Sequence, residues 1–540
     1  MNGLILLATI ITLALLGSRL FVVVGIATAL CFMLYVPAEG MDILSQLDRI
    51  EGKMESLTTK NVFLSIPFFI AAGSIMTKGG IAKRLTDLAS ALVGWMPGGL
   101  AVASIIACII FAAISGSSPV TLVAVGAVMF PALVDAGYPK KFSIGLITSA
   151  GSLGCMIPPA ISMLIYAISV QGSAAVDPAD LFFAGLVPAL FIAGLLAAYA
   201  VWVGLGVKGS RIPFDGGDAW RSFKGAAWAL TLPFIVLGGI YGGIFTPTEA
   251  GAVAFAASIV ISTLVHRDVS FRQLPAILVE AATLMGSLIL IVILAFGLND
   301  FLAEIEAPDV IRGWVQDADL SSWQFMLLTN VILIVLGALM DSISATLVFA
   351  PILAPVAINH YGIDPIHFGI VFVVNMEIGY LAPPVATNLF VAAAIFRQPF
   401  IDVAKAVIPT LSIICGALVV LMYIPAFSLY PLNARDGTDR PMAFPWDGKA
   451  AVEESAPPAP SAGADPGRPL TLEEMMKQAK ENVENEGAPS PPADDDPGTP
   501  GRALTLEEMM KQAKAQVAAD DAAVADPAAA PEAPVTPPAE

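Results

Sequence analysis

A glycine, a proline and three serines interrupt one of the most apolar parts of the chain. Residues 115–119 read Ser-Gly-Ser-Ser-Pro and lie between the apolar stretches 105–114 and 120–133. Serine hydroxyls, and the backbone carbonyls that a broken helix leaves free, are hard oxygen ligands of the kind that bind sodium in membrane proteins. The helix N-terminus that follows such a break carries a partial positive charge and favours an anion. The segment therefore predicts a site that binds a small cation and an anion together.

The same pattern recurs in the second half of the chain at a constant offset in residue number, which we call the repeat offset. It pairs Ser117 with Ser342, Thr121 with Thr346, Gly154 with Gly379, Pro158 with Pro383, and Pro159 with Pro384. Two breaks in corresponding positions of two halves are typical of transporters whose binding site lies at the interface of internal repeats. We therefore expect both halves to contribute to one site.

The polar residues also have a purely structural interpretation. Ser115, Ser117 and Ser118 could serve close helix packing, which is common in membranes, although packing requires neither the proline nor the second break. Asp341 is ionisable at membrane depth, where such residues are functional candidates, but it could instead cap a half-helix. For Glu249, in the sequence Thr-Pro-Thr-Glu-Ala, a helix cap is the preferred interpretation.

The elements that position these breaks must be membrane helices. Broken backbone at membrane depth persists only inside protein or beside a water-filled cavity, and a span needs about 20 helical residues. Several apolar segments are shorter, so we expect re-entrant hairpins at residues 88–134 and 325–358, with tips at 115–119 and 341–346. The interruptions at 151–159 and 379–384 then unwind two crossing helices. The predicted fold is an all-α polytopic membrane protein with inverted repeats, two re-entrant helical hairpins and two unwound transmembrane helices.

Composition excludes a soluble globular protein. Hydrophobic residues make up 56% of the 540 residues and charged residues 13%, with a mean hydropathy of +0.78, so we predict an integral protein in contact with membrane lipid. The four cysteines lie in apolar segments without metal-ligand spacing and are predicted to be small core residues. The sequence contains no phosphate loop, zinc-ligand spacing or nucleophile elbow. We therefore predict no enzyme activity, no cofactor, no nucleic-acid binding and no ATP-driven transport by this chain alone.

Four parts of the chain differ in composition. Residues 1–61 are predicted to form N-terminal scaffold helices and an amphipathic connector, 62–225 the first repeat with its hairpin, 226–430 the second repeat with its hairpin, and 431–540 an acidic cytoplasmic tail. A signal peptide is the alternative for the first apolar segment, but no small-residue cleavage site follows it. Basic residues within 208–224 and 267–272 predict that these connections face the cytoplasm.

The C-terminal tail carries most of the net charge of −18. From Asp436 onwards it contains 21 acidic and 8 basic residues, and its Pro, Ala, Asp and Glu content is typical of disorder. Within it, the segment Gly-Arg-Pro-Leu-Thr-Leu-Glu-Glu-Met-Met-Lys-Gln-Ala-Lys at 467–480 recurs at 501–514 with one change, Pro469 to Ala503. Each copy has a capping box and one apolar helical face. We interpret the copies as two short amphipathic helices for a cytoplasmic partner, with an accidental duplication as the alternative.

Five stretches of the sequence resemble the large membrane subunit of tripartite ATP-independent periplasmic (TRAP) transporters, the DctM-like subunit. They are residues 66–76, 115–126, 151–166, 242–252 and 375–388, and the resemblance covers about residues 1–430. It implies an elevator-type, ion-transporter-like secondary transporter in the bacterial inner membrane, in which sodium drives uptake of an organic acid. It also implies two partners, a small four-helix membrane subunit (DctQ-like) and a periplasmic solute-binding protein (DctP-like). The small subunit that is fused in some relatives is not in this sequence, so we expect a separate partner chain. The repeat-bearing tail is also outside the family pattern.

The resemblance also assigns residues to the site. Sodium ligands would come from Ser115, Ser117, Ser118, Gly151 and Gly154 in the first half, and from Ser342, Thr346, Gly379 and Pro383 in the second. Substrate contacts would come from Ser117, Ser162 and Asp341. Family members carry dicarboxylates, sialic acids, keto acids and other carboxylates. Two alternatives remain: a stand-alone sodium-dicarboxylate carrier that needs no binding protein, and a channel or membrane scaffold.

Overall fold

The computed structural model describes residues 64–171, 174–207, 213–283, 318–339, 342–383, 386–438 and 440–446, with isolated positions between 9 and 31 and between 285 and 313. All regular secondary structure in these residues is helical, which confirms the predicted all-α class. Three sequence predictions lie outside the described residues: almost all of the N-terminal scaffold, the hairpin-tip residue Asp341, and the two tail repeats.

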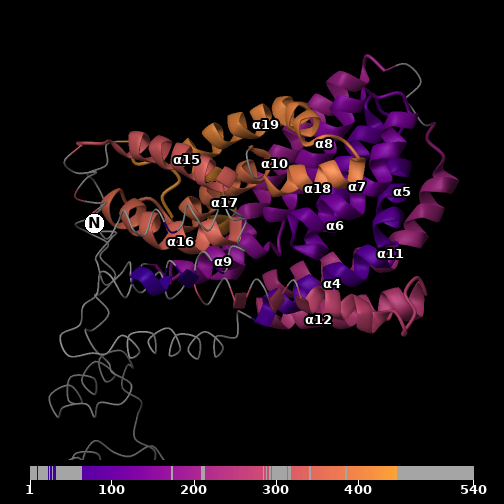
Figure 1. The fold of residues 1–540 in the computed structure, drawn as a ribbon, viewed down its shortest axis with the longest axis horizontal. Coiled ribbons are helices and arrows are strands. Elements are labelled where there is room, and N and C mark those ends of the chain that lie inside the picture. The colour runs from indigo at the N-terminus through magenta and orange to yellow at the C-terminus, as the bar shows by residue number, and fades with distance from the viewer. Residues whose placement is uncertain are drawn as a thin grey trace, which may run out of the picture. The chain divides into compact units, whose positions relative to one another are not determined.

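The helices begin and end close to the predicted breaks (Figure 1). The first repeat contains α4 (Ser65–Lys78), α5 (Ile81–Val93), α6 (Gly99–Ser115), α7 (Ser118–Asp135), α8 (Lys140–Ser152), the 3₁₀ turn η2 (Leu153–Cys155), α9 (Ile161–Ser169) and α10 (Pro178–Gly204). They are followed by α11 (Gly216–Tyr241), α12 (Pro247–Val260) and the π-helical turn η3 (Ile261–Val265). Within the predicted second repeat, residues 226–430, and just beyond it, the chain continues with α15 (Ser322–Leu339), α16 (Ser342–Pro355), the π-helical turn η4 (Val356–His360), α17 (Pro365–Leu381), α18 (Thr387–Phe396), α19 (Phe400–Tyr423) and α20 (Ala426–Asp436).

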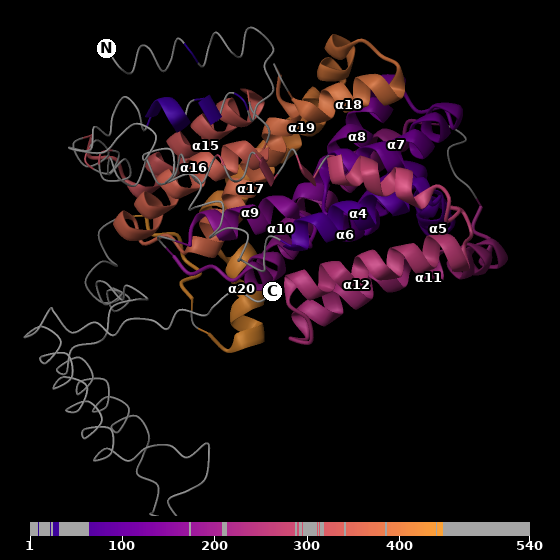
Figure 2. The same cartoon turned by 60° about the horizontal axis from the view of Figure 1, so that its bottom comes forward.

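The two halves interlock. The repeat offset carries the starts of α7, α8, α9 and α10 close to the starts of α16, α17, α18 and α19. Helix α8 packs against α19, and its counterpart α17 packs against α10. Likewise α7 packs against α18, and α16 packs against α9. Corresponding helices of the two halves therefore make corresponding contacts with the opposite half. Figure 2 shows α16, α17 and α19 of the second half packed with α9 and α10 of the first.

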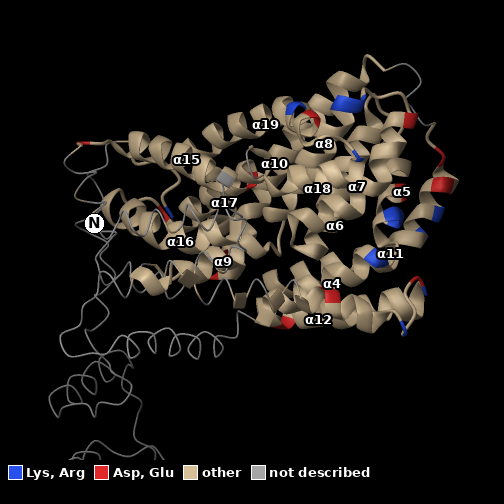
Figure 3. Ribbon diagram, in the orientation of Figure 1, with Lys and Arg blue, Asp and Glu red and all other residues tan. Residues whose placement is uncertain are grey.

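Six described helical segments are long and apolar enough to cross a membrane. They are α7, α10, α11, α12 with η3, α16 with η4, and α19, and the bent pair α4 and α5, which turns by 72°, would make a seventh. Helices α6, α15, α17 and α18 are apolar but shorter, in keeping with the interruptions in the sequence. Figure 3 shows the packed helices largely free of charged residues, many of which gather around α5 and α11 and near helix ends.

The break between α6 and α7 follows from its glycine and proline. Gly116 ends α6 with a φ of 60°, in the left-handed region that favours glycine. A Cβ atom at this position would lie 2.3 Å from the carbonyl oxygen of Pro159. Pro119 then occupies the first turn of α7. Backbone N–H groups in the first turn make no hydrogen bond within the helix, so the proline costs none there. The segment therefore stops one helix and starts the next within two residues.

Two smaller sequence predictions are confirmed. Glu249 caps α12: its carboxylate accepts a hydrogen bond from the Thr246 backbone N–H at 2.8 Å, and the Thr246 hydroxyl accepts one from the Glu249 N–H at 3.3 Å. The four cysteines are unpaired; Cys31, Cys108 and Cys155 are buried as predicted, whereas Cys415 is half-buried.

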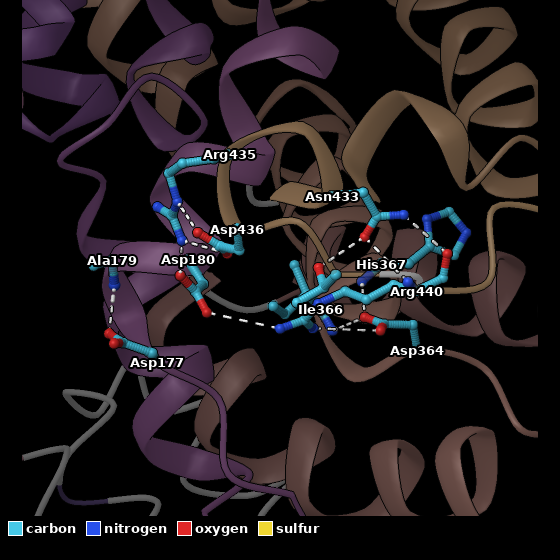
Figure 4. Close-up of polar contacts among 11 residues, drawn as sticks. Asp177, Ala179, Asp180, Asp364, Ile366, His367, Asn433, Arg435, Asp436 and Arg440 are labelled. Atoms are coloured by element: carbon cyan, nitrogen blue, oxygen red, sulfur yellow. Dashed lines mark hydrogen bonds and ion pairs between the residues drawn. The ribbon is translucent and has the colours of Figure 1, made fainter. Parts of the chain in front are cut away.

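Ion pairs tie α20 and the residues that follow it to α10 and α17 (Figure 4). Arg435 of α20 donates to Asp180 in the first turn of α10, and also to the neighbouring Asp436 at 2.6 Å. Arg440 lies 3.5 Å from Asp364, which caps the start of α17. We call these five residues the C-terminal clasp. Ordered packing thus continues beyond residue 430, where composition places the start of the tail.

His367 lies beside this clasp and is buried, although it stands in the first turn of α17, close to a helix end. Its side chain is 2% exposed. The two ring nitrogens lie 2.9 Å from the Ser428 hydroxyl and 3.1 Å from the Met422 carbonyl oxygen. The packing of α20 and of the end of α19 over the start of α17 encloses the ring, an effect of tertiary structure that local sequence does not encode.

Replacing Arg435 with alanine should lower the thermal unfolding temperature of the purified protein. The change removes the cation that Asp180 and Asp436 share, although Arg440 still lies 3.8 Å from Asp180. Hydrogen bonds to charged groups contribute roughly 1.5–3 kcal/mol each. Arg435 lowers the pKa of Asp436 by hydrogen bonding, so this stabilisation is present above the ordinary carboxyl pKa of about 4 and is lost as pH falls below it. The matched control is Arg221→Ala, which breaks a far more exposed pair with Asp218 and should cost less than about 0.5 kcal/mol. Equal effects of the two substitutions, or an Arg435 effect that does not shrink in acid, would show that the clasp does not stabilise the fold.

Candidate functional site

The first break holds a compact group of oxygens. The Ser115 hydroxyl lies 2.9 Å from the Thr121 hydroxyl and 3.4 Å from the carbonyl oxygen of Ser117. Thr121 donates to the same carbonyl at 2.9 Å. Ser115 and Thr121 are buried, whereas Ser117 is half-buried. The gap between α6 and α7 thus presents hydroxyl and carbonyl oxygens of the kind predicted for a cation site.

The second break repeats this contact. Thr346 donates to the carbonyl oxygen of Ser342 at 2.6 Å, the same bond that joins Thr121 to Ser117 in the first half. Ser342 also donates to the Tyr380 hydroxyl at 2.8 Å. The repeat offset found in the sequence therefore corresponds to equivalent hydrogen bonds in space.

Glycines at or near the ends of α8 and α17 allow close approach to the helices that flank the two breaks. A Cβ atom on Gly154 would lie 2.9 Å from the backbone of Ser117, and one on Gly379 would lie 2.6 Å from the backbone of Gly337. Gly151 approaches Leu122 of α7 in the same way, at 2.9 Å. Each of the three positions therefore admits hydrogen but no larger side chain without a shift of backbone or core.

Side chains at four helix N-termini meet across the two halves. Asn388, in the first turn of α18, donates to the Ser118 hydroxyl at the start of α7 at 2.5 Å. Ser162, in the first turn of α9, lies 3.4 Å from the hydroxyl of Ser342 at the start of α16. The Cys155 thiol interacts with both Ser118 and Ser162 and so connects the two pairs. The partial positive charges of these N-termini favour an anion beside the oxygens of the two breaks.

The structure places the predicted site residues as follows. Those buried around the two breaks are Ser115, Ser118, Gly151, Gly154, Ser162, Ser342, Thr346 and Gly379. Pro383 is exposed, and Gly379 is still helical, because α17 continues to Leu381 and unwinds only at Ala382. Asp341 has no described position. Ser162, a predicted substrate contact, thus lies next to Ser342, a predicted sodium ligand.

Asn388, Tyr380 and Glu377 were not assigned to the site from the sequence. Asn388 and Glu377 each have a buried oxygen without a hydrogen-bond partner among the described residues. A signal for Glu377 was present: the repeat offset pairs it with Ser152, and these two side chains lie 2.9 Å apart. In the described part of the chain, no group of three or more His, Cys, Asp or Glu side chains could hold a metal ion. Hydroxyl, amide and carbonyl oxygens therefore dominate the site.

Comparisons with known proteins agree with this architecture. A family model described as "Tripartite ATP-independent periplasmic transporter, DctM component" matches residues 7–427. The chain is 40% identical over 443 residues to the C4-dicarboxylate TRAP transporter large permease protein DctM of Rhodobacter capsulatus, covering 79% of this chain and 98% of that one. It is 38% identical over 369 residues to the isethionate TRAP transporter permease protein DctMQ of Oleidesulfovibrio alaskensis, covering 68% of this chain and 57% of that one.

One solved structure supports the fold. The crystal structure of the Alcanivorax borkumensis YdaH transporter aligns with a TM-score of 0.55 and 13% identity, over 74% of this chain and 96% of that chain. The match to the family model ends at residue 427, so Arg435, Asp436 and Arg440 of the C-terminal clasp lie beyond it. The family match, the identity to the Rhodobacter capsulatus permease and the membrane-spanning helices together show that the chain belongs to the DctM component family of tripartite ATP-independent periplasmic transporters, whose members are multi-pass permease subunits and not enzymes.

Proposed function

We propose that the chain couples sodium entry to the uptake of an organic acid across the bacterial inner membrane. The observation that carries this proposal is the hydroxyl-to-carbonyl contact that recurs at both helix breaks, Thr121 to Ser117 and Thr346 to Ser342. It supports two equivalent cation sites, one in each half, beside helix N-termini that favour an anion. Sodium is the coupling ion in this proposal, and no organic cofactor takes part.

The proposed roles follow the geometry. In the first half, sodium would be bound by oxygens of Ser115, Ser117 and Ser118 beside the backbone of Gly151 and Gly154. In the second half it would be bound by oxygens of Ser342 and Thr346 and by the backbone between Gly379, in the last turn of α17, and Pro383, where the chain is no longer helical. The substrate anion would lie between them, against Ser117 and Ser162. Asp341 would act through a bound sodium ion or a hydroxyl, because a direct contact would repel a carboxylate.

The part of the protein that moves during transport would contain the helices that are too short to span the membrane. We propose that α6 with α7, and α15 with α16, form the two re-entrant hairpins, because α6 and α15 are shorter than a full span. Their tips would move together with the unwound segments in an elevator-type displacement. A separate small four-helix membrane subunit would support the moving part, and a periplasmic solute-binding protein would deliver the substrate.

The substrate class follows from the charge of the site and from the relatives. The names of two relatives specify a C4-dicarboxylate and isethionate, which are small organic anions. The uncharged lining of hydroxyls and helix N-termini suits such an anion without a buried arginine. We propose a carboxylate of this size as the substrate.

Reconstituted uptake tests the proposal. The chain, its small membrane subunit and its binding protein should accumulate a radiolabelled four-carbon dicarboxylate in proteoliposomes only when a sodium gradient is directed inward. A potassium gradient of equal size should give no accumulation. Uptake by the chain alone would favour a stand-alone carrier, and ion flux without any dependence on substrate would favour a channel; either result would contradict the proposal.

A further inference from the structure

A cavity of about 330 Å³ lies where the end of α4, the turn after η3 and the helix Leu274–Thr283 meet. Its lining combines charged, polar and apolar side chains, among them Lys78, Asp268, Val269, Gln273, Ile277 and Glu280. Its described lining includes no residue assigned to the two helix breaks. The volume is in the range of pockets that bind small ligands, so the cavity is a candidate for a second binding site.

The packing around the cavity fixes its shape. Val269 and Ile277 are buried and form a small apolar cluster with Ile75 of α4. The guanidinium group of Arg84, on α5, donates to both carboxylate oxygens of Asp268, and these two side chains are only 28% and 26% exposed. Four elements therefore hold the turn and its carboxylate in place before any ligand binds.

The charges that line the cavity are of both signs. Lys78 Nζ lies 3.5 Å from Glu280 Oε2, and these side chains are 54% and 59% exposed. An ion pair this exposed contributes at most about 1 kcal/mol, so it opens readily for a ligand that offers each partner an opposite charge. Asp268 keeps free lone pairs beside Arg84, because a carboxylate accepts about four hydrogen bonds. The helix Leu274–Thr283 begins at the cavity and adds a partial positive charge there.

The surroundings of the cavity are those of a membrane–water interface. Apolar side chains are exposed on η3, on the turn and on the helix that follows: Leu264, Val265, Phe271 and Val279. The same turn carries Arg267 and Arg272, whose basic character predicts that it faces the cytoplasm. Basic pockets between membrane helices on this side bind lipid headgroups. A ligand here therefore has both a charged part and an apolar part.

From this geometry we propose that the cavity binds one phospholipid with a primary ammonium headgroup, namely phosphatidylethanolamine. The phosphate lies against Lys78 and the start of the helix Leu274–Thr283, and the ammonium group donates to Asp268 and Glu280. The acyl chains follow the exposed apolar side chains. An anionic headgroup without an ammonium group would meet the two carboxylates with nothing to offer them, and a choline headgroup has no N–H to donate. This site depends on neither sodium coupling nor the transported substrate.

Native mass spectrometry of the purified full-length chain tests the choice of lipid. Phosphatidylethanolamine, phosphatidylglycerol and phosphatidylcholine with identical acyl chains are added separately at equal concentrations. One phosphatidylethanolamine per chain should be retained more tightly than either of the other lipids. Tighter retention of phosphatidylglycerol would indicate an anion site, and equal retention of all three would indicate unselective lipid contact; either result would overturn the proposal.

The soluble headgroup glycerophosphoethanolamine separates a lipid site from a site for a soluble zwitterion. It has the same phosphate and ammonium groups but no acyl chains, so it should displace the bound lipid only at far higher concentration. Displacement at an equal concentration would show that the acyl chains contribute nothing and that the ligand is not a lipid.

Two substitutions test the cavity itself. Lys78→Gln and Glu280→Gln each remove one charge from an exposed side chain, so the unfolding temperature without added lipid should stay unchanged. Each should weaken retention of phosphatidylethanolamine by about fivefold, and Glu280→Gln should narrow the preference over phosphatidylglycerol. The matched control Asp218→Asn breaks the exposed pair with Arg221 on α11 and should retain lipid as the wild type does. Identical retention in all four proteins would place the lipid elsewhere and refute the site.

Discussion

Gly116→Ala should reduce uptake by at least tenfold and lower the thermal unfolding temperature. Its Cβ would lie 2.3 Å from the Pro159 carbonyl oxygen, and the residue has a φ of 60°. A left-handed conformation costs an ordinary residue roughly 1–2 kcal/mol, and overpacking typically costs about 1–3 kcal/mol more. To relieve the clash, the first break must move away from the unwound segment that follows η2. This movement would also stretch the hydrogen bond that the Ile161 N–H donates to the Gly116 carbonyl at 3.2 Å.

Gly194→Ala in α10 is the matched control. No atom outside its own helix lies within 4 Å of a Cβ at that position, and alanine favours a helix over glycine by about 1 kcal/mol. Uptake and thermal stability should therefore stay unchanged or rise slightly. If Gly116→Ala behaves like Gly194→Ala in both measurements, the close approach of the first break to Pro159 is not needed for function.

The internal repeat explains why much of the fold could be predicted from one sequence. Gly116, Pro119 and the Gly-then-Pro-Pro segments are backbone signals, and each acts locally on where a helix stops. The Gly-then-Pro-Pro segments recur at one constant offset, as do Ser117 and Thr121 beside the first break, and this recurrence separates them from accidental breaks. Helices α7 and α16 consequently start beside the two predicted breaks. Because they start at equivalent positions, Thr121 and Thr346 make equivalent hydrogen bonds.

Contacts between distant segments could not be predicted in the same way. Asn388 meets Ser118, and Ser428 meets His367, because helices from different parts of the chain pack together, and no local pattern encodes those partners. The second unwinding also begins later than expected. Gly379 is still helical, and a Cβ there would lie 2.6 Å from the backbone of Gly337. The glycine therefore permits contact between two helices and does not mark the break itself.

Ser117→Ala and Ser342→Ala should each weaken sodium binding by about tenfold or more. Each substitution removes one hydroxyl oxygen from its break. The backbone carbonyl of the same residue already accepts a hydrogen bond from a threonine, Thr121 or Thr346. A tenfold loss of affinity corresponds to about 1.4 kcal/mol. Ser104→Ala is the control, since this buried serine of α6 donates to the Leu100 carbonyl of its own helix. It should leave sodium affinity unchanged.

Sodium-specific stabilisation of the purified chain tests most directly whether the two breaks form the ion site. A ligand that binds only the folded state raises its stability in proportion to the logarithm of the ligand concentration above Kd. At constant ionic strength, replacing potassium with sodium should raise the thermal unfolding temperature of the wild type and of Ser104→Ala. The rise should require more sodium in Ser117→Ala and in Ser342→Ala. An equal unfolding temperature in sodium and potassium, or an identical sodium response in all four proteins, would contradict the account.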